Sequence, residues 1–192
     1  MKKLPEDFAT KLLDASHQIP TGSGFDVSVD DVARMADIPR ATLYYYFSGK
    51  DDLVEFYMND LMDRTRAAIQ KAAASEGTTA ERLANVMAAV IGAFAEYPQM
   101  CLELPGAIKG AEDHAALMAN MDRSVMQPFR EVLIEGRATG ELSLTDIEVA
   151  ADAIMGALHL VSMKQLIVKG TLNAQETADL VVPQLINGLL PR

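Results

Sequence analysis

Residues 40–47 read Arg-Ala-Thr-Leu-Tyr-Tyr-Tyr-Phe, and this short segment decides how the whole chain is interpreted. Leu43 and Phe47 are four residues apart, so on a helix they share one face and can anchor it to a neighbouring core. Three consecutive tyrosines remain for other contacts. Their hydroxyls suit phosphate oxygens, and their rings can pack against sugars and thymine methyl groups. The segment therefore predicts a helix that binds DNA.

A second short helix precedes this segment. Val29, Val32, Ala33 and Ala36 follow helical spacing, and residues 37–39 supply a tight turn. The small Ala33 side chain permits a close crossing between helices. Two short helices joined in this way predict a helix-turn-helix, whose second helix presents its first residues to base edges in the major groove.

The predicted DNA contacts lie in and around the second of these helices. Arg40 stands in its first turn and is expected to read base edges, while Lys50 and the N–H groups that start the next helix form a phosphate site. No acidic residue occurs between Ile38 and Lys50. One alternative is that the tyrosines are partly buried and that Arg40 is only a solvated helix start. The predicted DNA-binding residues are Ser28, Arg40, Ala41, Thr42, Tyr44, Tyr45, Tyr46 and Lys50.

The same stretch resembles the TetR family of repressors. The resemblance is carried by residues 24–33, Ala36, Ile38, residues 42–47 and residues 50–53. Residues 136–142, Gly-Arg-Ala-Thr-Gly-Glu-Leu, also resemble the turn before the penultimate helix of that family. The resemblance implies a homodimer, a palindromic operator and a small-molecule pocket in the body.

The chain departs from the family pattern in and beside the helix-turn-helix. Asp37 stands where the family often has glycine, Pro39 where it has a serine or threonine cap, and Tyr46 where histidine is common. These departures bear on operator sequence and affinity more than on the fold.

The rest of the sequence also indicates helices. Capping boxes at Thr78–Glu81, Thr145–Glu148 and Asn173–Glu176 predict helix starts, and Pro128 predicts a kink. We expect an all-α, TetR-like fold of about nine helices, with an N-terminal three-helix helix-turn-helix domain at 1–50 and a C-terminal helical ligand-binding and dimerisation bundle at 51–192. The expected helices are 5–19, 29–36, 40–47, 50–74, 79–96, 98–109, 115–139, 146–169 and 174–190.

Composition limits the classes of function. The net charge of the 192 residues is −10, but residues 1–50 carry only −1 and residues 51–192 carry −9. Net charge governs steering and solubility, so it does not exclude DNA binding by a local surface. The apolar runs at 83–95 and 180–191 are shorter than the roughly 20 residues that span a bilayer. The start of the chain lacks a secretory signal, and the one cysteine fits a reducing compartment. We therefore expect a cytoplasmic protein with no membrane partner.

Catalytic and metal chemistry find no support in the sequence. The three histidines lie on different segments, and Cys101 has no partner at a metal-binding spacing. We therefore expect no metal, no cofactor and no enzymatic activity.

Eleven methionines invite the interpretation of an adaptable apolar pocket in the body. For any single methionine, an ordinary place in the core is the alternative. The predicted ligand-binding residues are Met87, Ile91, Phe94, Met100, Leu104, Met118, Met121, Met126, Phe129, Met155 and His159.

The last two predicted helices carry more apolar surface than one monomer needs, which is typical of a four-helix bundle built from two copies. Burial within a single larger core is the alternative. The predicted interface residues are Ile154, Leu158, Val161, Val182, Leu185, Ile186 and Leu189.

The sequence thus predicts a DNA-binding transcriptional regulator, a repressor that binds a palindromic double-stranded operator as a homodimer and is released by a small hydrophobic effector. The alternative is a helical small-molecule-binding protein whose degenerate head no longer binds DNA. Asp37, Pro39 and the overall acidity favour this alternative slightly.

Overall fold

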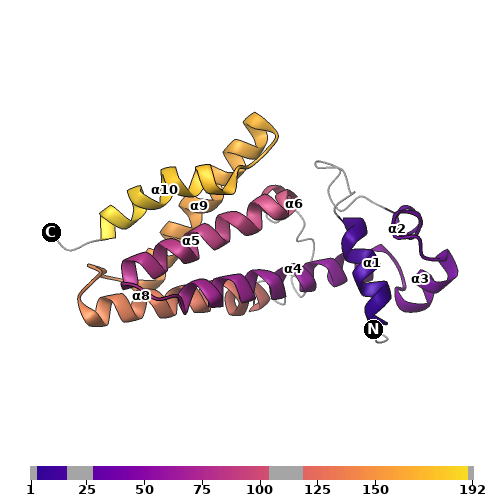
Figure 1. The fold of residues 1–192 in the computed structure, drawn as a ribbon, viewed down its shortest axis with the longest axis horizontal. Helices are drawn as coiled ribbons and strands as arrows, with labels where there is room; N and C mark the ends of the chain where they lie inside the picture. Colours follow the sequence, from indigo (N-terminus) through magenta and orange to yellow (C-terminus); the bar gives the residue numbers. More distant parts are fainter. Residues whose placement is uncertain (1–3, 17–27, 104–118, 190–192) are drawn as a thin grey trace. The chain divides into compact units, whose positions relative to one another are not determined.

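The computed structural model describes residues 4–16, 28–103 and 119–189, except for the side chains of residues 99, 100 and 103. Every regular element within these residues is helical, which confirms the predicted all-α class (Figure 1). The elements are α1 Glu6–Ser16, α2 Val29–Met35, α3 Arg40–Tyr46, α4 Lys50–Ala73, α5 Thr79–Glu96, α6 Pro98–Glu103, the π-helical turn η1 Asp122–Met126, α8 Gln127–Thr139, α9 Ile147–Lys169 and α10 Ala174–Leu189.

The chain divides into two compact units, Met1–Leu61 and Met62–Arg192. The division lies inside α4, whereas we placed the domain boundary at the start of this helix. The first turns of α4 belong to the N-terminal unit because Phe56 and Tyr57 pack against its core. The Tyr57 hydroxyl also donates a hydrogen bond of 2.9 Å to the Leu12 carbonyl in α1.

One apolar cluster holds the N-terminal unit together. Leu43 and Phe47 are both 1% exposed, so they anchor α3 as their four-residue spacing predicts. The buried cluster consists of Leu12, Ala15, Val29, Val32, Ala33, Ala36, Ile38, Leu43, Phe47 and Leu53.

The turn between α2 and α3 depends on a left-handed residue. Asp37 has a φ of 51°, a conformation that disfavours most side chains but that aspartate and asparagine tolerate. The turn is closed by the Ile38 N–H, which donates to the Ala33 carbonyl at 2.9 Å. This geometry explains why glycine is frequent at this position in the family and why aspartate can replace it.

We predict that Asp37→Val destabilises the N-terminal unit, whereas Asp37→Asn does not. A β-branched residue at positive φ costs roughly 1–2 kcal/mol, while asparagine accepts this conformation. Chemical denaturation of the two variants and the wild type would measure the difference. Equal stability of all three proteins would show that the turn relaxes without strain.

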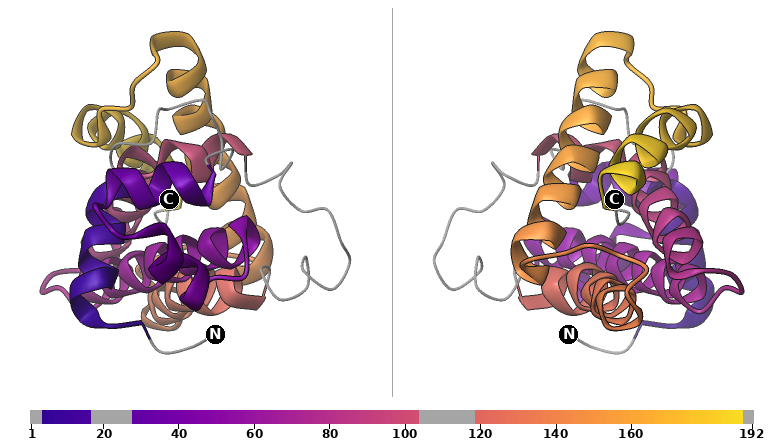
Figure 2. Two further views of the ribbon diagram at one scale, coloured as in Figure 1. Left: turned by 90° about the vertical axis from the view of Figure 1, so that its right-hand side faces the viewer. Right: turned by 90° about the vertical axis from the view of Figure 1, so that its left-hand side faces the viewer.

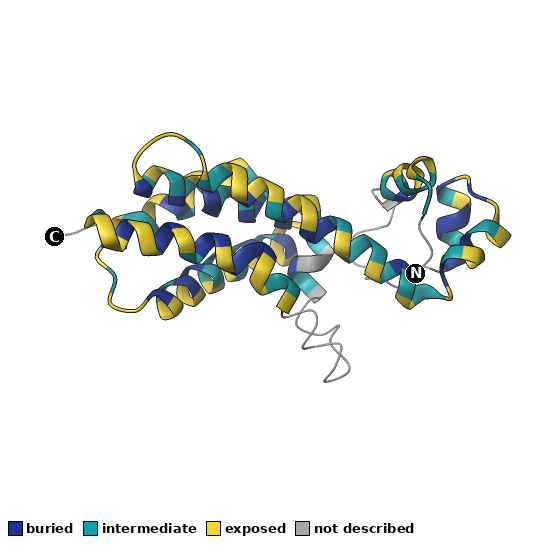
Figure 3. Ribbon diagram, turned by 90° about the horizontal axis from the view of Figure 1, so that it is seen from below, coloured by how far each residue is buried: buried dark blue, intermediate teal, exposed yellow. Residues whose placement is uncertain are grey.

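The C-terminal unit is a bundle centred on α5. Helix α10 lies along α5, and α8 and α9 pack against α5 from other sides (Figure 2). Buried residues occupy the facing sides of these helices and exposed residues the outward sides (Figure 3). Helix α5 begins with the predicted capping box, in which Thr78 and Glu81 each bind the backbone N–H of the other. In contrast, α9 is capped by Asp146 and not by the predicted Thr145.

Pro128 perturbs its helix as expected, but as a π-helical turn. Residues 122–126 form η1 directly before α8, with Pro128 in the first turn of α8. Because proline has no N–H to donate, the regular ladder of hydrogen bonds is interrupted at this point. The turn buries Ser124 completely, and the Ser124 hydroxyl accepts a 2.9 Å hydrogen bond from Nη2 of Arg66 in α4.

The segment from Gly136 to Leu142 joins α8 to the start of α5. Gly140 ends α8 in the left-handed conformation, with a φ of 78°, and the Leu142 N–H donates to the Gly136 carbonyl at 2.9 Å. Glu141 accepts hydrogen bonds from the N–H and hydroxyl of Thr79, at 2.8 and 3.1 Å. This turn therefore caps α5 from a distant part of the sequence.

Candidate nucleic-acid interface

The exposed face of α3 is formed by Arg40, Ala41, Tyr44 and Tyr45. Tyr44 is 44% exposed and Tyr45 is 60% exposed, although both are large aromatic residues. The four positions form two pairs spaced by four residues, so they share the face opposite to Leu43 and Phe47. These side chains can reach base edges and phosphates when the helix enters a groove.

Tyr46 and Thr42 are half-buried and contribute less to this face. The Tyr46 ring packs on the apolar cluster and meets Phe8 edge-on, with 6.4 Å between centroids. The alternative of partial burial therefore describes Tyr46, while Tyr44 and Tyr45 face outward. Because Tyr46 follows the buried Leu43 by three residues, the two lie on the same side of the helix. This spacing could have indicated from the sequence that Tyr46 is more buried than Tyr44 and Tyr45.

Ser28 and Lys50 lie at the starts of the helices beside α3. The Ser28 side chain caps α2 by accepting from the Asp31 N–H at 3.1 Å, so its role here is structural. Lys50 begins α4, where the N–H groups are turned toward a potential phosphate. Just before α4, the Ser48 N–H already has a partner, because it donates to the Asp52 carboxylate at 2.7 Å. This hydrogen bond holds the pKa of the Asp52 carboxyl below its usual range.

Arg40 is held by two neighbours. Its Nε lies 2.7 Å from Oδ1 of Asp30 in α2, and its guanidinium carbon lies 5.4 Å from the centre of the Tyr44 ring. The Arg40 side chain nevertheless remains 68% exposed. The recognition helix thus presents a partly restrained cation next to two outward tyrosines.

Apart from Leu104 and Met118, the predicted ligand-binding residues lie on helical segments of the C-terminal unit. Met87, Ile91, Phe94, Met126 and Phe129 are buried, and Met121, Met155 and His159 are half-buried. Leu104, Met118 and the side chain of Met100 lie outside the described residues.

His159 connects α6 to α9. Its Nε2 lies 2.7 Å from the Cys101 carbonyl and its ring is 5.6 Å from that of Phe94. Burial raises the pKa of the Cys101 thiol to about 11, which keeps it protonated and inert at neutral pH. Among the described residues, no cluster of histidine, cysteine and carboxylate side chains could hold a metal ion.

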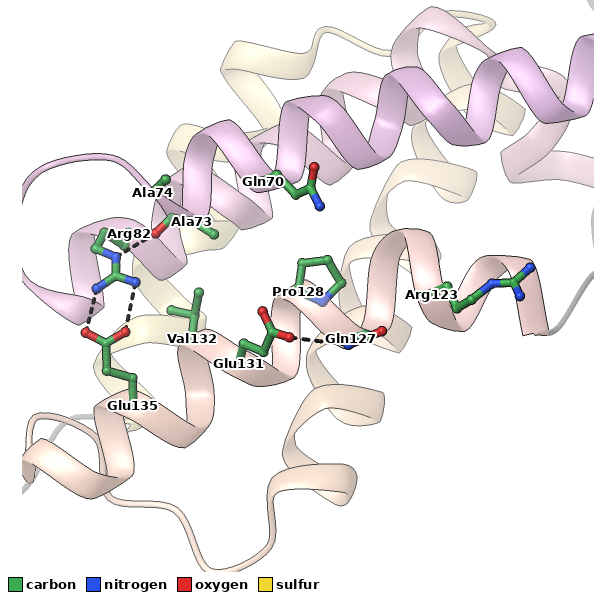
Figure 4. Close-up of a pocket in the computed structure, with 10 residues that line it drawn as sticks. All are labelled: Gln70, Ala73, Ala74, Arg82, Arg123, Gln127, Pro128, Glu131, Val132 and Glu135. Atoms are coloured by element: carbon green, nitrogen blue, oxygen red, sulfur yellow. Dashed lines mark hydrogen bonds and ion pairs between the residues drawn. The ribbon is translucent and has the colours of Figure 1, made fainter.

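A groove of about 410 Å³ lies between the C-terminal end of α4 and α8 (Figure 4). It contains none of the predicted ligand-binding residues. Arg82 from α5 closes one end: its Nε donates to the Ala73 carbonyl at 2.7 Å, and Nη1 and Nη2 donate to Glu135 at 2.6 and 2.9 Å. The lining residues are Gln70, Ala73, Ala74, Arg82, Arg123, Gln127, Pro128, Glu131, Val132 and Glu135.

We predict that the stabilisation contributed by Arg82 depends on pH. The hydrogen bonds from Arg82 lower the pKa of Glu135, so this contribution is present above the pKa of an unfolded glutamate, near 4.3, and is lost as the pH falls through the lower folded value. Arg82→Ala should reduce the melting temperature at pH 7 and much less at pH 3, with Arg82→Lys intermediate at pH 7. A pH-independent difference would assign the role of Arg82 to packing alone.

Three residues predicted for a dimer interface are instead buried within the protomer. Leu158 is 0% exposed, and Ile154 and Val182 are also in the core. Val161, Leu185, Ile186 and Leu189 are half-buried. The chain itself already covers the side chains of these three residues, and the assignment of all seven residues to a dimer interface stays a prediction.

A second apolar seam follows the outward side of α9. Its positions alternate by four and three residues, the spacing of a helix–helix seam, and all but the half-buried Met163 are exposed. Leu160 is 59% exposed, and a side chain added at Gly156 would meet no other atom within 4 Å. The outward seam consists of Val149, Ala153, Gly156, Leu160, Met163 and Ile167.

Comparison with known families matches both units. The family model "Bacterial regulatory proteins, tetR family" matches residues 12–56, and "Tetracyclin repressor-like, C-terminal domain" matches residues 76–189. The chain belongs to the TetR family.

Several solved regulators share the fold over nearly the whole chain. The fatty acid degradation regulator FadR from Bacillus halodurans has a TM-score of 0.81 and 19% identity, and the match covers 100% of both chains. FadR from Bacillus subtilis, solved with stearoyl-CoA, has a TM-score of 0.74 and 18% identity, and the match covers 93% of this chain and 98% of that chain. The ketosteroid regulator KstR2 of Mycobacterium tuberculosis has a TM-score of 0.72 and 18% identity, and the match covers 99% of this chain and 98% of that chain. A comparison with curated proteins found no match.

Membership of the TetR family clarifies the apolar character of α9. By length and composition, α9 is the one helix among the described residues that could cross a membrane. However, its face formed by Ile147, Ile154 and Leu158 belongs to the core of the bundle. The outward seam of α9 is the part of its apolar surface that the core of the bundle leaves uncovered.

Proposed function

We propose that this TetR-family regulator is a cytoplasmic repressor that binds a palindromic operator as a homodimer and is released by a small hydrophobic effector. The observation that carries the proposal is the outward face of α3, where Arg40, Tyr44 and Tyr45 stand exposed on a well-anchored recognition helix. Exposed aromatic residues on a short helix require an explanation, and base and backbone contacts in a major groove supply one.

The homodimer is supported by the outward seam of α9. Small residues at 153 and 156 allow two helices to approach closely, and Val149, Leu160 and Ile167 would supply apolar contacts around them. Exposed apolar surface of this continuity is uncommon on a monomer. A two-fold pair would also place two recognition helices on two half-sites.

The hydrophobic effector is supported by the buried apolar residues on α5, η1, α8 and α9 and by the ligand of one solved structure with a similar fold. The Bacillus subtilis FadR structure holds stearoyl-CoA, and we propose an effector with a comparably large apolar part. A ligand can release DNA only by preferring the state that does not bind DNA. Operator DNA must therefore weaken effector binding by the factor by which effector weakens operator binding.

The proposal is tested by selecting bound sites from a randomised duplex pool with the full-length protein. The expected result is one palindromic motif with two half-sites about one helical turn apart. Failure to select any sequence, with a folded protein at low salt, would favour the alternative of a helical ligand-binding protein with a degenerate head.

A further inference from the structure

We propose that Asp30 is a specificity-determining residue, which positions Arg40 to read a guanine in each half-site of the operator. The proposal rests on the DNA binding proposed above and adds the base that is recognised. It starts from the ion pair that joins α2 to the first residue of the recognition helix.

The geometry of this pair leaves the recognition atoms of Arg40 available. Oδ1 of Asp30 lies 2.7 Å from Nε of the guanidinium, and no hydrogen bond from Nη1 or Nη2 is found among the described residues. Guanine presents two acceptors in the major groove, O6 and N7, which two parallel N–H donors of one arginine can satisfy together. An arginine whose Nε lies beside a carboxylate, and whose terminal nitrogens make no hydrogen bond among the described residues, can match this pattern.

Two restraints act on Arg40 from different sides. The Oδ1 atom of Asp30 is shielded from solvent but accepts no hydrogen bond, so the pair is held by charge and not by a directed bond. The Tyr44 ring, one helical turn further along α3, supports the guanidinium at 5.4 Å. Holding a long side chain in one orientation before binding lowers the entropy cost of forming a bidentate contact.

Among the described residues, the carboxylate next to Asp30 in the sequence already has other partners. Asp31, the next residue, is engaged by the Ser28 hydroxyl and by Arg34. The Asp30 carboxylate therefore has a separate role, although a negative charge on a DNA-facing unit opposes phosphate binding. The Asp30 carboxylate therefore lowers the affinity for DNA of any sequence, but it orients the arginine that reads a base. Its net effect is to raise sequence specificity at the expense of affinity.

The experiment compares full-length wild type, Asp30→Asn, Arg40→Ala, Arg40→Lys and the Asp30→Asn/Arg40→Ala double variant on the operator selected above. Affinity is measured for the operator and for single-base replacements at each position. We expect Arg40→Ala to remove the preference for one guanine per half-site, and Arg40→Lys to remove most of it because lysine lacks the planar fork. Asp30→Asn should reduce that preference about tenfold and leave nonspecific affinity equal or higher.

The control is Asp51→Asn, which makes the same charge change at an exposed position of the N-terminal unit. It should leave the guanine preference unchanged, and Asp30→Asn should have no further effect when Arg40 is already alanine. Melting curves confirm that each variant folds. The inference is overturned if Asp30→Asn keeps the full preference, if Asp51→Asn lowers it equally, or if Arg40 reads a base other than guanine. In contrast, absence of any selected operator would overturn the proposed function itself.

Discussion

Replacing Leu160 with glutamate is expected to convert the proposed dimer into a folded monomer of 20.8 kDa. Leu160 is 59% exposed at the middle of the outward seam of α9, so the substitution costs the isolated protomer little. In a dimer, each copy would bury one unpaired carboxylate. Burying such a charge costs about 3–5 kcal/mol, which corresponds to a loss of affinity of at least a hundredfold. Sedimentation at micromolar concentration would measure the change.

Two further variants separate the seam from general surface effects. Gly156→Leu should also weaken the dimer, because a side chain there enters open space in the protomer but blocks close approach of a second helix. Ile134→Glu changes another exposed apolar residue, on α8, and should leave the dimer intact. A dimer that survives both Leu160→Glu and Gly156→Leu would place the interface elsewhere, and a wild-type monomer would remove it altogether.

The contrast between Leu158 and Leu160 shows where reasoning from sequence reached its limit. Both stripes of α9 are apolar, and the sequence correctly indicated that the helix has more apolar surface than one face needs. Which stripe is the core depends on the neighbours that α5, α6 and α8 provide. The pattern of a single helix does not make that choice, so the sequence did not separate the buried stripe with Ile154 and Leu158 from the exposed stripe with Leu160.

The helix-turn-helix could be predicted more completely because its information is local. Four-residue spacing identified the anchors Leu43 and Phe47, and a family pattern fixed the turn. The Asp30–Arg40 pair was missed because its residues lie on different helices, and its formation depends on the turn between them. Likewise, the groove beside Arg82 brings together residues from α4, α5, η1 and α8, so no local sequence pattern predicts it.

Gly136→Ala is expected to be the most destabilising small substitution in the C-terminal unit. A Cβ atom at this position would lie 2.5 Å from Cδ1 and 2.6 Å from Cγ of Leu142, and 2.8 Å from Cγ2 of Thr79. Both neighbours are almost completely buried, so neither side chain can move into solvent. Overpacking of this kind costs about 1–3 kcal/mol, and we expect the upper part of that range.

Gly136 therefore makes room for Leu142 and Thr79 to pack against the backbone of α8. Whether alanine raises or lowers the stability of the protein at a glycine position depends on such neighbours. Gly92→Ala in α5 is the matched control, because nothing lies within 4 Å of its added Cβ, and alanine favours a helix by up to about 1 kcal/mol. Urea denaturation should show Gly136→Ala less stable and Gly92→Ala equal to or more stable than the wild type. If the clash with Leu142 is the cause, the Leu142→Ala substitution should cost less in the Gly136→Ala background than in the wild type, because the smaller side chain makes room for the new methyl group. Additive losses would show instead that the strain resides in the backbone of the 136–142 turn, which also caps α5 through Glu141 and Thr79.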